Sequence, residues 1–350
     1  MENLKETSKQ IRRISNRATL PLLVYAVLYI GFTAFVPELI TDFLRTQGMT
    51  LSDSADNLMR YIFIYLLIIP ICMLSYKLTS RKEGVTLKSG FRKPEKPLGW
   101  CIKWIVIAIG ASSMLGAVPA LTSNILQSIF GTSASPMDSL FATQSLTVIS
   151  VPKTLGAVIA PLIFAPIIEE LMFRGLIYKN NQPLGEFFAI VISGLFFGLW
   201  HQNLPQVCTT AFMGMFFCFI YLKTKSIFPA MVGHFCNNLV VVIRDIIASK
   251  LDFSNFKLDP INTLADNWVI LLIFFVYAMA LSGLIITGLV LFIIELVKRK
   301  EFQFEKSNLE ITNKRKLLTF FTAPITLVVT IYLVVISVLN TIFGYFWFLK

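Results

Sequence analysis

The sequence contains few of the residues from which common soluble active sites and binding loops are built. Only two of its 350 residues are histidines, five are cysteines, and 15% carry a charge. The cysteines have no CxxC spacing and lie in or beside apolar segments, so we interpret them as small core residues rather than a disulfide framework. The sequence has no phosphate-binding loop, serine nucleophile elbow, internal repeat or eukaryotic retention signal. The usual signatures of nucleotide-binding proteins and serine hydrolases are therefore missing.

Hydrophobic residues, by contrast, make up 55% of the chain, and the mean hydropathy is +0.71. These values are typical of multi-spanning membrane proteins and predict an all-α, polytopic transmembrane helix bundle. About nine apolar segments are near or above the roughly 17–25 residues that cross a bilayer, the second and fifth being marginal. The predicted spans are residues 19–40, 61–76, 100–121, 154–177, 185–201, 205–222, 226–243, 268–297 and 317–348.

The positive charges are distributed along the chain as membrane topology requires. The net charge is +11, but lysine and arginine gather in alternate connections, such as residues 77–96 and 298–316, rather than on one patch. The positive-inside rule then predicts a multi-pass protein of the cell membrane with a cytoplasmic N-terminus, and the pattern argues against nucleic acid as a partner. We interpret the first 18 residues as a basic, solvated tail, with a short surface helix on anionic lipid as the alternative. The apolar run that follows lacks a clear cleavage site and predicts a spanning helix rather than a signal peptide.

Two carboxylates and an arginine lie inside the apolar segment at residues 165–175. Each ionisable residue at bilayer depth costs at least about 2.5–3.5 kcal/mol, so three of them close together predict a functional use. Glu170 and Arg174 are four residues apart with the acid first, the favourable order for an ion pair on one helix face. Glu169 lies about 100° further round the helix, away from Arg174. We therefore expect Glu170 to be neutralised locally and Glu169 to be the candidate general base.

Both histidines fall in apolar segments close to this one, which favours a functional role over simple packing. His201 ends its segment, and Glu169 and His201 are each sixteen residues from Gly185 in the turn between them. An antiparallel hairpin places two such side chains at matching depth. His234 is only seven or eight residues into its own predicted span, so we expect a tilt or a broken helix start at Pro229 to bring it level.

Four of these side chains together satisfy the requirements of amide hydrolysis. His234 and Asn238 are four residues apart and present an imidazole and an amide to the same point. Glu169 would take a proton from a water that His201 helps to hold, while His234 and Asn238 stabilise the oxyanion. Phe197, one turn before His201, is either a wall of this pocket or a core residue. Small residues let membrane helices approach closely, and we interpret five glycines as such packing positions: Gly175, Gly194, Gly198, Gly214 and Gly233.

Three motifs in this order resemble those of the CPBP family, the CAAX-processing type II prenyl endopeptidases and bacteriocin-processing enzymes also called Abi proteins. The motifs are Glu169-Glu170-x-x-x-Arg174, Phe197-x-x-x-His201 and His234-x-x-x-Asn238. The resemblance covers roughly residues 154–247 and implies a helical, glutamate-dependent intramembrane protease. By motif position it implies that Glu169 is the base, that His201 positions water, and that His234 and Asn238 form the oxyanion site. Glu170 and Arg174 would be supporting residues.

The expected organisation follows from this core. We expect a basic tail at residues 1–18, N-terminal spans and loops at 19–150, a catalytic core at 154–247 and a two-span extension at 268–350. The substrates that the resemblance implies are membrane-associated peptides or lipidated proteins, from prenylated C-termini to leader, pheromone or bacteriocin precursors. The lipid bilayer is the other expected partner.

Three alternatives stay open at this level. Glu169, His201 and His234 could hold zinc, but the histidines are on different helices without an HExxH motif, so metal-free hydrolysis is favoured and no cofactor is expected. The same fold could instead bind a peptide or immunity partner without catalysis, although a binder has no need of a buried carboxylate opposite a histidine. A transporter is the third reading, and the absence of inverted repeats counts against it.

Overall fold

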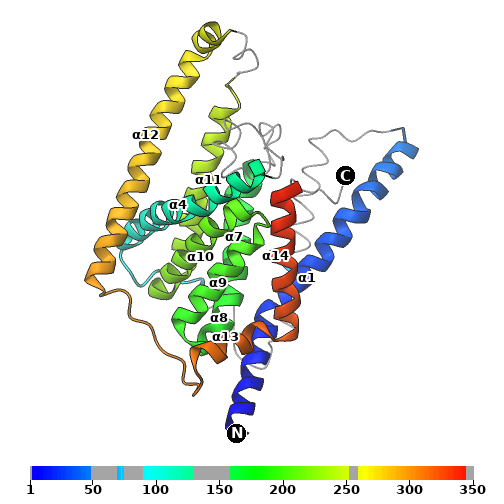
Figure 1. The fold of residues 1–350 in the computed structure, drawn as a ribbon, viewed down its shortest axis with the longest axis vertical. Coiled ribbons are helices and arrows are strands. Elements are labelled where there is room, and N and C mark those ends of the chain that lie inside the picture. The colour runs from blue at the N-terminus through cyan, green and yellow to red at the C-terminus, as the bar shows by residue number, and fades with distance from the viewer. Residues whose placement is uncertain are drawn as a thin grey trace.

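The structure is a computed structural model that describes residues 2–48, 69–71, 73–74, 90–129, 158–251 and 259–343. Across these residues every regular element is a helix, which confirms the predicted all-α bundle (Figure 1). Six stretches are long and apolar enough to cross a membrane: Leu4–Gly31, Leu98–Gly116, Gln206–Thr224, Phe228–Ala248, Pro260–Lys298 and Pro324–Thr341. The predicted span at 61–76 lies largely outside the described residues, so the number nine stays a prediction.

The N-terminal residues are part of a long helix, α1, which runs from Glu2 to Thr46. Ile11 and Ala18 are fully buried, and Ile14 is 5% exposed. The expectation of a solvated tail is therefore wrong. Apolar residues recur at helical spacing among the lysines and arginines of this stretch, so one face of the helix can pack on the bundle while the basic face stays outside.

The last described helix pairs with the first. Helix α14, Pro324–Phe343, lies beside α1 in Figure 1. Three buried hydroxyl groups join the two helices, since Thr326 Oγ1 lies 2.6 Å from Ser15 Oγ and 2.9 Å from Thr19 Oγ1. The predicted span at 317–348 is not one helix, because α13, Asn313–Phe321, ends just before Pro324. Proline disfavours a helical conformation in the residue before it, so the chain turns there and α14 starts afresh.

The centre of the bundle is formed by helices that approach one another closely. Helix α10, Leu204–Thr224, packs between α9, Glu186–Trp200, and α4, Leu98–Ile129, and α12, Pro260–Lys298, covers the other side of α4. A Cβ atom on Gly194 of α9 would lie 2.7 Å from the backbone oxygen of Ala211 in α10, and one on Gly198 would lie 2.7 Å from Ala211 Cβ. The prediction that Gly194 and Gly198 are packing positions is confirmed.

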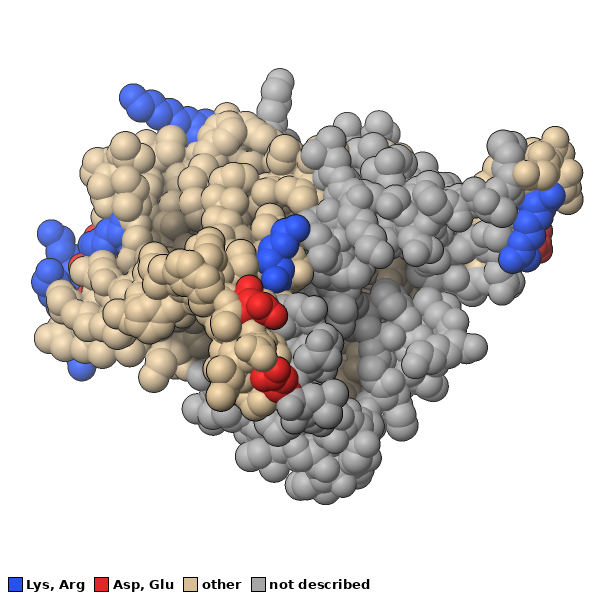
Figure 2. Space-filling model, turned by 90° about the horizontal axis from the view of Figure 1, so that it is seen from above, with Lys and Arg blue, Asp and Glu red and all other residues tan. Residues whose placement is uncertain are grey.

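Four connections that the charge pattern assigns to one side of the membrane meet at one end of the bundle, which we call the basic end (residues 90–97, 179–185, 225–227 and 299–312). Glu95 N donates to Thr224 O at 2.9 Å, and Glu186 N donates to Glu305 O at 3.0 Å. The start of α1 lies at the same end (Figure 1). Figure 2 views the opposite end, where Lys and Arg are scattered among mostly uncharged residues. These four basic connections thus lie together as predicted, and the cytoplasmic location of the basic end stays a prediction.

Candidate active site

The helix that carries the two carboxylates is irregular. It consists of a π-helical turn η3, Ala160–Phe164, then α7, Ala165–Glu170, the π-helical η4, Leu171–Tyr178, and a last turn α8, Lys179–Asn181. Ala165 N donates to Ala160 O, five residues back. Continuing this pattern would require Pro166 to donate to Pro161 O, but proline has no N–H. The carbonyl of Pro161 is therefore left without a backbone donor, in a type of helix that is frequent at functional sites.

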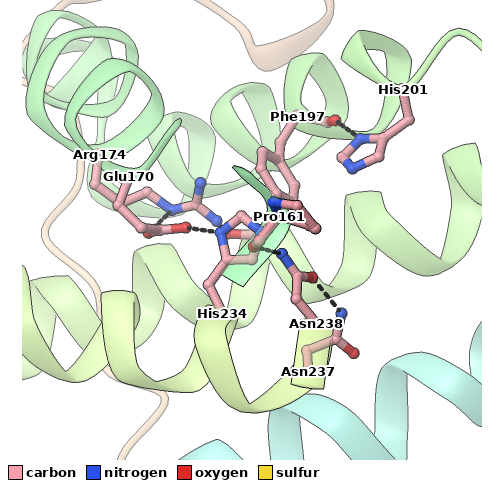
Figure 3. A network of polar contacts seen from close by, with 9 residues as sticks. Pro161, Glu170, Arg174, Phe197, His201, His234, Asn237 and Asn238 are labelled. Atoms are coloured by element: carbon pink, nitrogen blue, oxygen red, sulfur yellow. Dashed lines mark hydrogen bonds and ion pairs between the residues drawn. The ribbon is translucent and has the colours of Figure 1, made fainter. Parts of the chain in front are cut away.

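Glu170 is fully buried and holds two cationic or ionisable partners. Arg174 Nε lies 2.9 Å from Glu170 Oε2, with both side chains 0% exposed, which confirms the predicted ion pair. His234 Nδ1 lies 3.0 Å from Glu170 Oε1. Arg174 Nη2 also donates to Gly214 O on α10 at 3.3 Å. The chain Arg174–Glu170–His234 crosses the site in Figure 3 and neutralises the Glu170 carboxylate on both of its oxygens.

Glu169 has a different environment from its neighbour, as its position on the helix predicts. It is 6% exposed, and its Oε2 has no hydrogen-bond partner among the described residues. Trp200, His234 and Arg174 are the neighbours from other positions that act on its carboxylate. Trp200 directly precedes His201, and the matching depth of Glu169 and His201 stays a prediction. Glu169 is thus the carboxylate with an oxygen left for another ligand.

His234 reaches this depth without a break in its helix. Helix α11, Phe228–Ala248, starts regularly with Pro229 in its first turn. The expected broken start at Pro229 is therefore wrong, and the expected tilt stays a prediction. A π-helix closes its hydrogen bonds over five residues rather than four, so it advances less per residue than the about 1.5 Å of an α-helix. The eight residues of η4 follow Glu170 towards the basic end, so Glu170 lies nearer to that end than in a regular α-helix.

Asn238 replaces the donor that Pro166 lacks. Its Nδ2 donates to Pro161 O at 2.7 Å, and its Oδ1 accepts from Asn237 Nδ2 at 3.2 Å. A side-chain amide nitrogen carries two hydrogens. One of them holds α11 against η3, and the second is the one that could donate to an oxyanion.

His201 lies on the far side of the Phe197 ring from the hydrogen-bonded chain (Figure 3). Its Nδ1 lies 2.8 Å from Phe197 O, so Nδ1 carries the proton and donates to this carbonyl, which makes Nε2 the acceptor nitrogen. The Phe197 ring is 5.1 Å from the His201 ring, 5.5 Å from the His234 ring and 4.5 Å from Arg174 Cζ, measured from ring centroids. Phe197 is 1% exposed. It is therefore a core residue and a wall of the site at once.

Two residues of the site were not among those predicted for it. Trp200 lies in an apolar segment, and its position beside His201 at a helix end is the sequence signal that could have indicated it. Gly214 was predicted to be a packing position, which it is, since a Cβ there would lie 2.9 Å from Phe197 Cδ1. Its backbone oxygen is also an acceptor for Arg174, and no sequence pattern indicates that contact.

The residues kept as a zinc alternative are not gathered into a metal site. Across the described parts of the chain, no three His, Cys, Asp or Glu side chains are placed to hold a metal ion. His201 and His234 each place Nδ1 within hydrogen-bonding distance of a protein acceptor, as metal-binding histidines commonly do. The chemistry of each imidazole fits a metal, whereas the arrangement of Glu169, His201 and His234 does not.

Comparison with known proteins matches this part of the chain. Residues 151–240 match the family described as "Rce1-like: Type II CAAX prenyl endopeptidase Rce1-like". The chain is 28% identical over 148 residues to the Bacillus subtilis (strain 168) protein named "Putative membrane peptidase YdiL", which covers 42% of this chain and 56% of that protein. The chain therefore spans about half the length of this curated relative. No solved structure matches the present chain. All three motifs lie within the residues that match this family model.

Proposed function

We propose that the protein is an intramembrane endopeptidase in which Glu169 activates a water molecule for attack on a peptide bond. The observation that carries this proposal is the contrast between two adjacent buried carboxylates. Glu170 pairs with Arg174 and contacts His234, whereas Glu169 Oε2 has no ion-pair or hydrogen-bond partner among the described residues. A carboxylate held in an apolar site with an unused oxygen is suited to accept a proton from bound water.

His234 is proposed to form the oxyanion site together with Asn238. Its Nδ1 lies 3.0 Å from Glu170 Oε1, which orients the ring, and Nε2 is the nitrogen that would face the oxyanion. The second amide hydrogen of Asn238 would assist it.

His201 is proposed to hold the attacking water. Its Nδ1–H bond to the Phe197 carbonyl orients the ring, and Nε2 is the nitrogen that would accept from a water hydrogen. Phe197 limits the space between His201 and His234 and shields the site from bulk water. The two histidines would thus act on opposite sides of the same aromatic wall, one on the nucleophile and one on the oxyanion.

The substrate class is proposed from the setting of the site. The site lies within a bundle of apolar helices, so the peptide must reach it from the membrane or its surface. The matched family is described as acting on CAAX prenyl proteins, and the relative is named a membrane peptidase. We therefore propose a lipidated C-terminus or a membrane-associated leader, pheromone or bacteriocin-like peptide as substrate, hydrolysed without a metal.

The test is cleavage of membrane peptides encoded near the gene by the purified protein in detergent, with products identified by mass spectrometry. Wild type should cleave at one bond, and Glu169→Gln and His201→Ala should not. Activity is expected to be unaffected by chelation and by added zinc. Loss of activity on chelation and recovery with zinc would contradict the metal-free mechanism. No cleavage by folded wild-type protein would instead favour a non-catalytic peptide binder.

A further inference from the structure

A second polar cavity lies at the basic end, away from the proposed catalytic residues. Its volume is about 190 Å³, and its lining residues are Arg92, Tyr178, Lys179, Gln182, Tyr221, Leu222 and Lys225. Three connections of the basic end contribute to it, together with the ends of η4 and α10. None of these residues has a part in the proposed hydrolysis.

One lining residue of the cavity has a polar atom without a hydrogen-bond partner. Tyr178 is 1% exposed, and its hydroxyl group makes no hydrogen bond among the described residues. The ring is held edge-on against Tyr221, with centroids 5.7 Å apart and an interplanar angle of 87°. A buried hydroxyl group without a protein partner usually has a ligand or water as partner. Tyr178 lines the cavity, so the cavity is where that partner would lie.

Three cations, Arg92, Lys179 and Lys225, line the same cavity. Arg92 Nε donates to Lys225 O at 2.8 Å, and Arg92 Nη2 pairs with Glu95 Oε1 at 3.0 Å. Lys225 ends α10 in a left-handed conformation, with φ of 52°. Across the described residues, no carboxylate forms an ion pair with Lys225. The cluster therefore has more positive than negative charge.

Lys179 shows the effect of this crowding. Burial, with a further contribution from the Arg92 charge, lowers the pKa of Lys179 to about 8. The carboxylates whose charges act on Tyr178 are Glu186 and Glu305, and Glu186 Oε2 already accepts from Glu305 N at 3.0 Å. An anion in the cavity would relieve the repulsion among the cations and accept from the Tyr178 hydroxyl.

We propose that this cavity binds a phosphate group, either the headgroup of an anionic phospholipid or a soluble phosphate. A phosphate has several acceptor oxygens at tetrahedral angles, and an arginine, two lysines and a tyrosine hydroxyl are donors suited to them. A bound ligand with a single carboxylate would balance less of the positive charge of Arg92, Lys179 and Lys225. Tyr178 lies one helical turn after Arg174, so a phosphate bound here would also hold the end of the helix that carries Glu169 and Glu170.

The experiment measures binding to the purified full chain in an uncharged detergent at constant ionic strength. The probes are inorganic phosphate and mixed micelles containing phosphatidylglycerol, with phosphatidylcholine micelles as the zwitterionic reference. The variants are Lys225→Asn and Tyr178→Phe. Asparagine tolerates the left-handed conformation of residue 225. Arg299→Asn is the matched control, because Arg299 is an exposed residue with φ of 54° at the end of α12 and is not a lining residue.

We expect Lys225→Asn to raise the Kd of the bound probe about tenfold, as loss of a charge-assisted hydrogen bond does, and Tyr178→Phe to raise it a few-fold. Arg299→Asn should bind as wild type does. Tyr178→Phe should not lower the thermal stability of the protein without probe, since its hydroxyl has no protein partner to lose.

Binding of phosphatidylglycerol without inorganic phosphate would identify a lipid headgroup, and binding of both, or of phosphate alone, a site that a soluble phosphate can fill. The proposal is overturned if neither probe binds wild type, or if Arg299→Asn weakens binding as much as Lys225→Asn. It does not depend on the proposed hydrolysis, because the assay reads binding alone.

Discussion

Replacing Arg174 by methionine should destabilise the protein strongly. The Arg174–Glu170 pair is 2.9 Å long and both side chains are 0% exposed, so the variant leaves the Glu170 carboxylate buried without its main counter-charge. Breaking a buried ion pair from one side costs about 3–5 kcal/mol. His234 still contacts Glu170, so we expect a loss near the lower value, about 3 kcal/mol, in the free energy of unfolding.

Removing both charges should reverse most of that loss. In Glu170→Met/Arg174→Met no buried charge of the pair is left, and such replacements are often neutral. Catalysis should not recover with stability, because His234 loses the carboxylate that orients its ring. The double variant therefore separates the structural role of the pair from its role in orienting His234.

The assay is unfolding in mixed micelles of an uncharged detergent and dodecyl sulfate. Lys103→Met is the matched control, because the Lys103–Glu295 pair is also 2.9 Å long but its side chains are 29% and 9% exposed. Lys103→Met should lower the free energy of unfolding by about 1 kcal/mol or less. Equal losses for Arg174→Met and Lys103→Met, or a double variant no more stable than Arg174→Met, would refute the reasoning.

Three further predictions concern packing, the irregular helix and pH. Gly198→Ala should lower the free energy of unfolding by about 1–3 kcal/mol, because the added methyl group overpacks α9 against α10. Gly283→Ala is the control and should be neutral or stabilising, because no described atom of a neighbouring helix lies within 4 Å of the added methyl group. Unfolding in mixed micelles compares the two variants. Asn238→Ala should lower the free energy of unfolding by about 1 kcal/mol, because it leaves the Pro161 carbonyl without a donor. The loss should be smaller in a Pro166→Ala background, where residue 166 regains a backbone N–H. An unchanged loss in that background would contradict the role of Asn238 as the donor to this carbonyl. Burial lowers the pKa of Lys179 to about 8 from 10.5. Between these pH values the unfolded chain binds more protons than the folded protein, so the stability of the wild type should rise with pH. A Lys179→Gln variant whose stability rises as steeply with pH would contradict this reasoning.

The sequence was sufficient to predict the features that depend on local spacing. The four-residue separation of Glu170 and Arg174 predicted their ion pair, and it held even though Arg174 lies in a π-helical stretch. The glycines of α9 predicted a close approach between helices, because few other roles suit glycine within an apolar span. The difference between Glu169 and Glu170 likewise follows from one step around a helix.

The features that sequence reasoning missed depend on contacts between distant segments. Asn238 donates to Pro161 O because Pro166 has no N–H with which to do so. Pro166 lies 72 residues before Asn238, and no local sequence pattern contains both residues. The helical start of the chain is stabilised by packing of Ile11 and Ile14 against the bundle, while its lysines and arginines gave the impression of a solvated tail. Tertiary packing outweighed local composition in both places.

The most direct measurement of the central proposal is the single-turnover rate of peptide cleavage by Glu169→Gln, compared with wild type under identical detergent conditions. Glutamine preserves the size of the side chain and removes its capacity to accept a proton, so any change reports on proton transfer once thermal unfolding shows the variant to be folded. Positioned general bases typically contribute about 10²–10⁴-fold, and we predict a loss of that size with little change in stability. Cleavage by Glu169→Gln at the wild-type rate would contradict the assignment of Glu169 as the base.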